Sequence, residues 1–283
     1  MIDVQTLIQE ARELQPLQQS SIRLAQLFSQ EDWFLSEITE VIRLDEALAG
    51  RLIGAANSAL SGSREPIKTV DHAVMRVGTG SVLSLALAAS IQEDMQQAIP
   101  QYGLSEGQLW KHSVAAALAV EEAAPFCRRK VPSEAYAAAL LHDIGKLVLA
   151  RHIPPGLFDK LREAGNDDPT AGIDAEAAAL EVHHAGIGGV VASNWGLPDP
   201  IAVGVTYHHN PLEAPTEEGR RLCNLVGMAD AVAHAIGVGC GTGSPIPEFS
   251  PAQAERLGMT GLGFEGLCAA VESRLEDVLK LYD

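Results

Sequence analysis

The sequence is poor in aromatic residues and in basic residues. Aromatic residues make up 5% of the chain and apolar residues 47%, so we expect a core built mostly from Ala, Leu, Val and Ile, as in close-packed helical proteins. Lys and Arg number 20 against 37 Asp and Glu, which gives a formal net charge of −17 over 283 residues. Binding to a nucleic-acid backbone or to an anionic membrane surface needs clustered positive charge. We therefore expect no direct nucleic-acid binding and no membrane partner.

Paired cysteines and long apolar runs are also missing. The four cysteines are scattered and include no CxxC pair: Cys127, Cys223, Cys240 and Cys268. This pattern predicts neither a disulfide framework nor a thiolate zinc site, and it suits a reducing compartment. The sequence starts without a basic segment followed by an apolar run, and no apolar stretch reaches the roughly 20 residues that span a bilayer. We expect a cytoplasmic protein.

The order of polar and apolar residues predicts successive helices along the chain, and no segment has a convincing strand alternation. Predicted helix starts include two N-caps and two capping boxes, at Asp45, Thr69, Ser105–Gln108 and Ser250–Gln253. The last helix is predicted from about 266 to 281, from apolar residues that recur on one side.

Two Gly- and Pro-containing loops, at 99–103 and 237–251, divide the chain. We predict an all-α fold with two helical lobes. An N-terminal helical lobe covers residues 1–98, a bundle with nearly all the histidines covers 99–238, and a C-terminal helical extension packed on the bundle covers 239–283.

His142 and Asp143 are adjacent at the end of an Ala-rich helical run, and Gly145-Lys146 follows them. Neighbouring residues on a helix point about 100° apart, so the two side chains cannot share one face with an apolar stripe. One of them must face the interior or a cleft, where an unpaired polar group is costly. Further candidate ligands are His112, His184, His208, His209 and Asp230. These residue types are what a carboxylate-bridged pair of divalent metal ions requires.

These residues resemble a known family. His112 and the His142-Asp143 pair are similar to the HD superfamily of metal-dependent phosphohydrolases, and the whole chain looks like an HDOD protein, a bacterial HD-related signalling module. The stretches that carry the second match are 52–59, 69–87, 184–188, 195–198 and 207–211.

The resemblance implies an HDOD-type helical lobe before an HD-like bundle, and a role in signal transduction and gene regulation. Its enzymatic relatives, the HD-GYP proteins, hydrolyse cyclic di-GMP with two or three bound metals. Their ligand pattern falls on His112, His142, Asp143, His184, His208, His209 and Asp230. Asp143 would then bridge two ions and Lys146 would face a substrate phosphate, so these two are the catalytic candidates if the protein is an enzyme.

Two departures from the HD-GYP pattern matter. Gln108 stands where a trinuclear site has a Glu one helical turn before the first His, which argues against a third metal. Asn210-Pro211 follows His209, with no Gly-Tyr-Pro loop, which argues against cyclic di-GMP as substrate.

Other interpretations stay open for the same residues. The His142-Asp143 pair can cap a helix, His208-His209 can open a loop before Pro211, and Lys146 can be solvated. The whole His/Asp set can form a buried hydrogen-bond network without metal. His183 is expected to be solvated or to support a ligand, whereas three histidines lack matching partners and are expected at the surface or satisfied in the core: His72, His152 and His234.

We predict a regulatory module that acts through protein–protein interaction with an unidentified signalling protein and contains a His/Asp metal site. Two divalent ions are expected, of Fe, Mn, Ni or Zn. The alternative is a metal-dependent phosphohydrolase, a phosphodiesterase acting on a nucleotide or cyclic dinucleotide, which would bind a phosphate-containing small ligand. The sequence leaves open whether the protein is an enzyme.

Overall fold

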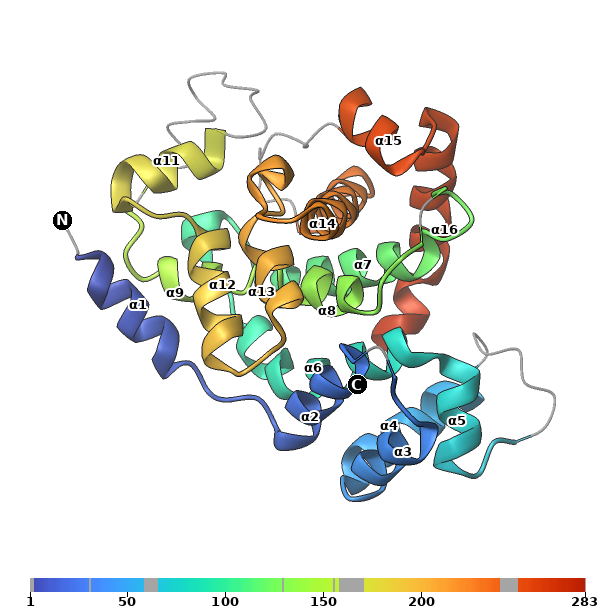
Figure 1. Ribbon diagram of the computed structural model, residues 1–283. Helices are drawn as coiled ribbons and strands as arrows, with labels where there is room; N and C mark the ends of the chain where they lie inside the picture. Colours follow the sequence, from blue (N-terminus) through green and yellow to red (C-terminus); the bar gives the residue numbers. More distant parts are fainter. Residues whose placement is uncertain are drawn as a thin grey trace.

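The computed structural model describes residues 3–30, 32–58, 66–128, 130–154, 156–157, 171–239 and 249–282 (Figure 1). Within these ranges the chain is helical, and an isolated bridge between Ile99 and Leu104 is the only extended pairing. The predicted all-α fold is confirmed.

The first six helices divide between two parts of the molecule. They are α1 (Val4–Glu13), α2 (Gln19–Phe28), α3 (Leu35–Arg43), α4 (Glu46–Asn57), α5 (Val70–Val77) and α6 (Thr79–Met95). Helices α2 to α5 cluster at one end, and we call them the N-terminal lobe (Figure 1). In contrast, α1 packs against α12 and α9 of the bundle, and α6 contacts both α2 and α8. Residues 1–98 therefore contribute to both parts, and a domain boundary at residue 98 stays a prediction.

The bundle surrounds two long helices, α7 and α14, which pack against each other. Its elements are α7 (Gln108–Glu122), α8 (Glu134–Leu141), α9 (Lys146–Leu149), α11 (Ala171–Leu180), α12 (His184–Asn194), α13 (Asp199–Thr206) and α14 (Glu217–Ala235), with 3₁₀ turns η2 (Pro100–Tyr102) and η3 (Pro211–Glu213). Helices α15 (Pro251–Leu257) and α16 (Gly261–Leu279) follow, and both contact α14.

Three predicted helix starts are confirmed and one is wrong. The side chains of Asp45, Thr69 and Ser250 each accept a hydrogen bond from a backbone amide in the first turn. The box at Ser105–Gln108 forms only in half: Gln108 Oε1 accepts from the Ser105 amide at 2.7 Å, but α7 begins at Gln108 behind Gly107. Gly107 has φ 76°, a left-handed conformation that favours glycine, and it sets the start of the helix instead.

One further helix boundary differs from the prediction. The last helix starts at Gly261, earlier than predicted, because Thr260 caps it by accepting from the Gly263 amide. No single helix among the described residues is both long and apolar enough to cross a membrane; α5 and α6 meet that test only together, and they are bent by 108°.

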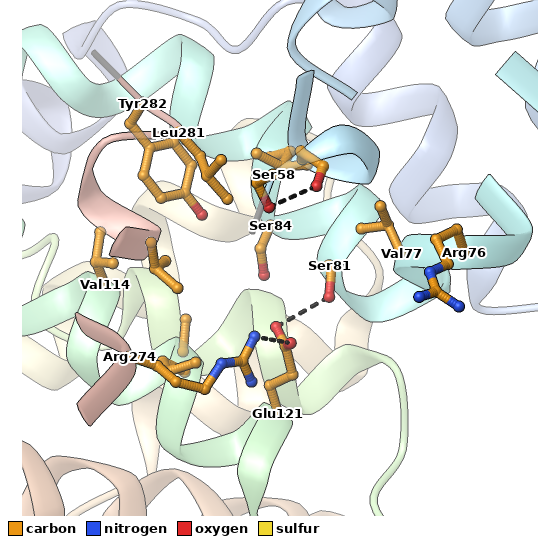
Figure 2. A pocket seen from close by; sticks show the side chains of 15 residues that line it. Ser58, Arg76, Val77, Ser81, Ser84, Val114, Glu121, Arg274, Leu281 and Tyr282 are labelled. Atoms are coloured by element: carbon orange, nitrogen blue, oxygen red, sulfur yellow. Dashed lines mark hydrogen bonds and ion pairs between the residues drawn. The ribbon is translucent and has the colours of Figure 1, made fainter. Parts of the chain in front are cut away.

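A cavity of about 280 Å³ lies where the N-terminal lobe, the bundle and α16 meet (Figure 2). Its lining mixes apolar side chains with Ser81, Ser84, Glu121 and Arg274. Ser81 Oγ donates to Glu121 at 2.9 Å, and Arg274 forms an ion pair with the same carboxylate at 3.4 Å. Ser84 Oγ is buried and has no hydrogen-bond partner, so the cavity has an unsatisfied polar group in its wall.

Candidate metal centre

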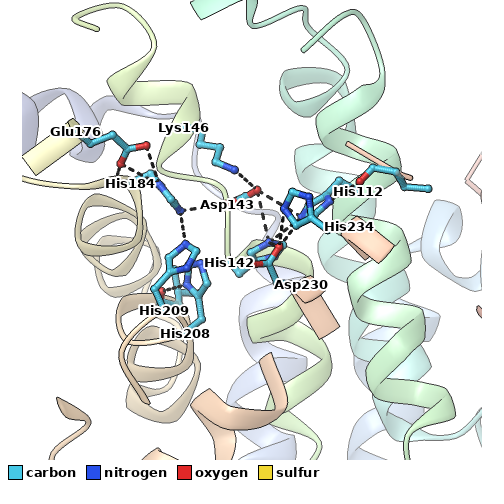
Figure 3. A network of polar contacts seen from close by, with 12 residues as sticks. His112, His142, Asp143, Lys146, Glu176, His184, His208, His209, Asp230 and His234 are labelled. Carbon is cyan, nitrogen blue, oxygen red and sulfur yellow. Dashed lines mark hydrogen bonds and ion pairs between the residues drawn. The ribbon is translucent and has the colours of Figure 1, made fainter. Parts of the chain in front are cut away.

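All seven predicted ligands meet in the middle of the bundle (Figure 3). His142 and Asp143 directly follow α8, where the helix gives way to a turn, and His208 and His209 follow α13 after Tyr207. His112 lies on α7, His184 begins α12 and Asp230 lies on α14. Six of the seven are only 0–5% exposed, and His209 is half-buried. Five separate segments of the chain are therefore needed to assemble the cluster.

Asp143 joins two groups of ligands. Its Oδ1 lies 3.3 Å from His184 Nε2, and its Oδ2 lies 3.5 Å from His142 Nε2 and 3.6 Å from His112 Nε2. We call His184, His208 and His209 the first His group, and His112, His142 and Asp230 the second His group. Since one carboxylate has an oxygen toward each group, its geometry is that of a bridging ligand.

Backbone carbonyls orient three of the imidazoles. The Nδ1–H of His112 donates to Val238 O at 2.9 Å, that of His142 to Ala139 O at 2.7 Å, and that of His208 to Val205 O at 2.7 Å. In this tautomer each Nε2 carries a lone pair, which is the arrangement found in metal-binding histidines.

The Nε2 atoms face one another at short range. His112 Nε2 and His142 Nε2 are 3.1 Å apart, and His184 Nε2 and His209 Nε2 are 3.0 Å apart. His208 Nε2 is buried without any hydrogen-bond partner. Converging lone pairs repel unless a proton or a cation lies between them. Nitrogen ligands at about 2.1 Å from one ion are separated by roughly 3 Å, so the residues fit a bound divalent metal.

Burial favours the neutral form of three of the imidazoles, whereas for His142 the carboxylates of Asp143 and Asp230 outweigh burial and raise the pKa. Burial, together with His142 and His184, lowers the pKa of His208 to about 3. Burial is also the main cause that lowers the pKa of His112 and of His209. For Asp143, burial acts in the opposite direction, but Lys146 and the neighbouring histidines outweigh it and hold the pKa well below its usual range. Neutral imidazole and ionised carboxylate are the forms that bind metal.

Lys146, the second catalytic candidate, lies on Asp143. Its Nζ is 2.6 Å from Asp143 Oδ2, and burial, which would lower its pKa, is outweighed by that carboxylate, which raises it. The ammonium group also lies 5.6 Å from the centre of the Tyr102 ring. Its role toward a substrate phosphate stays a prediction.

Two residues of the cluster were missed in the sequence. Glu176 on α11 is 1% exposed and holds His184, accepting from its backbone amide at 2.6 Å and lying 2.9 Å from its Nδ1. An acidic residue inside an Ala-rich helix was the available signal. His234, which was expected at the surface or satisfied in the core, has a partner in the cluster, because its Nε2 lies 3.3 Å from Asp230 Oδ1, one helical turn earlier. The spacing of four residues was the signal there.

The three remaining histidines do not belong to the cluster. His183 is the N-cap of α12, where its Nδ1 accepts from the Gly186 amide at 3.3 Å. His152 is paired with Glu10 at 2.9 Å, which attaches α1 to the bundle, and His72 is exposed. Of the cysteines, Cys127, Cys223 and Cys268 are free thiols, and Cys240 lies outside the described residues.

Comparison with known proteins gives the family. The HDOD domain family model matches residues 14–211. The chain belongs to the HDOD family. An uncharacterized protein of Treponema pallidum is 28% identical to this HDOD chain over 197 residues, which are 69% of the chain and 37% of that protein. The chain thus spans little more than a third of this curated relative.

Solved structures share the fold. An HDOD domain protein of unknown function from Geobacter sulfurreducens has a TM-score of 0.70 at 22% identity, covering 99% of this chain and 98% of its own. A candidate signal transduction protein from Marinobacter aquaeolei has a TM-score of 0.67 at 21% identity, covering 99% and 64%. A candidate phosphohydrolase from Shewanella amazonensis has a TM-score of 0.64 at 21% identity, covering 98% and 96%. At these identities the similarity shows the fold alone.

Proposed function

We propose that this HDOD protein is a regulatory module that acts by binding another protein, and that its His/Asp centre binds divalent metal ions that hold the bundle in one arrangement. The burial of the ligands carries this proposal. Six of the seven predicted ligands are at most 5% exposed, so ions there are enclosed by protein and are suited to holding five chain segments together.

The N-terminal lobe supplies the surface for a partner. Among the described residues, six large apolar side chains are exposed, and four of them belong to this lobe and the loops at its helices: Trp33, Phe34, Leu44 and Met75. Phe34 is 67% exposed and Leu44 is 83% exposed. Apolar side chains gathered on one part of a surface are a feature of protein-binding regions.

Helix α7 lies between the metal centre and the cavity beside this lobe. His112 points into the cluster, while Val114 and Glu121 line the cavity beside the lobe. At 100° per residue, these two positions lie roughly 160–180° from His112 around the helix. Opposite faces of one helix thus contact the ligands and the junction, so a change in the arrangement of either is passed on through a single rigid element.

A matched pair of surface variants tests the proposal. Phe34→Ser/Leu44→Ser alters the lobe, and Leu212→Ser/Leu262→Ser alters the two exposed apolar side chains outside it. Metal-loaded protein is used to capture partners from the source cells, with quantitative mass spectrometry. We expect one partner that the wild type and the second variant retain and the first variant loses. Equal capture by all three, or no capture beside turnover of a phosphate ester, would contradict the proposal.

Metal-dependent phosphohydrolysis is the second candidate, because Asp143 has one oxygen toward each His group. Two bound ions would lower the pKa of a water molecule and stabilise charge on a phosphate. Asp143 would hold both ions, and Lys146 would leave Asp143 to contact the phosphate. The test is a panel of phosphodiesters and nucleotides with Mn, Fe, Ni or Mg, compared with His142→Ala/Asp143→Ala. Turnover that this double variant lacks would establish the second candidate.

A further inference from the structure

His234 lies beside two of the predicted ligands without belonging to the predicted set. It is on α14, four residues after Asp230, so both side chains are on one face of that helix (Figure 3). Its Nε2 is 3.3 Å from Asp230 Oδ1, and the same oxygen is 3.1 Å from His112 Nε2 on α7. The imidazole centres of His112 and His234 are 4.8 Å apart.

These three residues can bind one ion together. One donor atom of each lies within 4.8 Å of the others, which makes the group compact enough for a single coordination sphere. The Nδ1–H of His112 donates to Val238 O, so the Nε2 of His112 is the atom that faces the other two residues. Two imidazoles and one carboxylate form a common ligand set for divalent first-row metals such as Zn, Fe and Mn.

This group does not include the position at which the sequence would place a ligand for a third ion. Gln108, which stands where a third-ion ligand would precede His112, does not serve the cluster, because its Oε1 accepts from the Ser105 amide at 2.7 Å. His234 instead brings a donor to His112 from the neighbouring helix. The expected absence of a third ion considered α7 alone, whereas the donor comes from α14.

We propose that His112, Asp230 and His234 form a separate divalent-cation site at the α14 end of the cluster, beyond the two ions expected at Asp143. The inference rests on the metal centre of the proposed function, because Asp230 is shared with the second His group. The Nε2 of His112 has one lone pair and binds one ion, so with an ion at this site the ion of the second His group keeps His142, Asp143 and Asp230. A simple ion pair between a protonated His234 and Asp230 is the competing explanation, and it predicts no ion at this position.

Metal content separates the two explanations. Tag-free protein is reconstituted with Mn or Zn, and bound metal per folded chain is measured by inductively coupled plasma mass spectrometry for the wild type, His234→Ala and His152→Ala. The last variant removes a histidine paired with Glu10, outside the cluster. We expect His234→Ala to hold one ion fewer per chain than the wild type, and His152→Ala to hold the wild-type number.

A second variant and a folding measurement distinguish the loss of a ligand from the loss of the fold in His234→Ala. His234→Gln keeps a neutral polar side chain of similar reach, and circular dichroism reports whether each variant is folded. X-ray absorption at the metal edge, multiplied by the metal content, should give fewer imidazole ligands per chain in both His234 variants, and the same number in His152→Ala.

Each other result overturns the proposal in a distinguishable way. Unchanged metal content and unchanged imidazole count in both folded His234 variants would leave the ion pair as the explanation. Loss of all metal from folded His234→Ala would mean that the residue belongs to a shared centre and not to a separate site. No metal in the wild type after reconstitution would reject the metal centre of the proposed function together with this site.

Discussion

The bundle and the N-terminal lobe distribute polar and apolar side chains in opposite ways. The bundle buries His112, His142, Asp143, Glu176, His184, His208, Asn224 and Asp230. The N-terminal lobe buries only Ser21 and Thr39 among polar side chains in its described helices, and it exposes Phe34 and Leu44. Buried polar groups are tolerated only when they have partners, and exposed apolar groups mark surfaces that bind. The proposed function accordingly assigns an inward-facing ligand site to the bundle and an outward-facing contact surface to the lobe.

The largest expected effect is on close packing around the metal centre. Gly145 has φ −64°, which any residue adopts, but a Cβ there would fall on the backbone carbonyl of His184. We expect Gly145→Ala to cost about 4 kcal/mol of unfolding free energy and to reduce metal content, because α12 must move away. Urea unfolding followed by circular dichroism measures the cost.

Gly54 in α4 is the matched position in the lobe, since a Cβ there meets nothing within 4 Å. Gly54→Ala should gain about 0.5–1 kcal/mol, because alanine is the better helix former. A Gly145→Ala variant as stable as the wild type and fully metal-loaded would remove the claimed contrast in packing.

The second effect separates the stability of the lobe from the metal centre. Ile38 in the lobe and Ile201 in the bundle are both 0% exposed. Each change to alanine should cost about 3 kcal/mol, from lost burial and a cavity. Ile38→Ala should leave metal content unchanged, while Ile201→Ala, on the helix that precedes His208, should weaken metal retention. Equal metal loss in both variants would show that the two parts do not behave separately.

The third effect is a pH dependence that belongs to the bundle. In metal-free protein the pKa of His208 is lowered to about 3, so between that pH and 6.5 the unfolded chain binds a proton that the folded chain does not. Stability must then fall as the pH decreases through 6.5. His208 alone should contribute a loss of about 2 kcal/mol between pH 6.5 and 5. Urea titrations at both pH values should show a smaller loss for His208→Gln and an unchanged loss for His72→Gln, which alters an exposed residue.

The smallest expected effect concerns the junction between the two parts. Ser84 Oγ is buried without a hydrogen-bond partner, whereas Ser21 Oγ donates to Ala86 O at 2.7 Å. Ser84→Ala should be neutral or stabilising by up to about 1 kcal/mol, and Ser21→Ala should lose about 1 kcal/mol. Thermal unfolding measures both, and a clear destabilisation by Ser84→Ala would indicate an interaction of that hydroxyl.

Local sequence patterns predicted those features that depend on neighbouring residues. The caps at Asp45 and Thr69 need only a side chain and the next turn, and the adjacent His142 and Asp143 attract attention in any sequence. Glu176 and His184 meet across the short connection between α11 and α12, a contact that no local pattern specifies. His234 was overlooked for a different reason, since its spacing from Asp230 was visible but its neighbour His112 comes from another helix.

The burial of the ligands also bears on timing. Six of the seven ligands of the proposed ions are only 0–5% exposed, so we expect ion exchange to require an opening of part of the bundle and to be limited by the rate of that opening and not by affinity alone. Such a centre would take up its ions while the chain closes around them. The metal found in it would then record which ion was available when that molecule folded, and would change little for the rest of its lifetime.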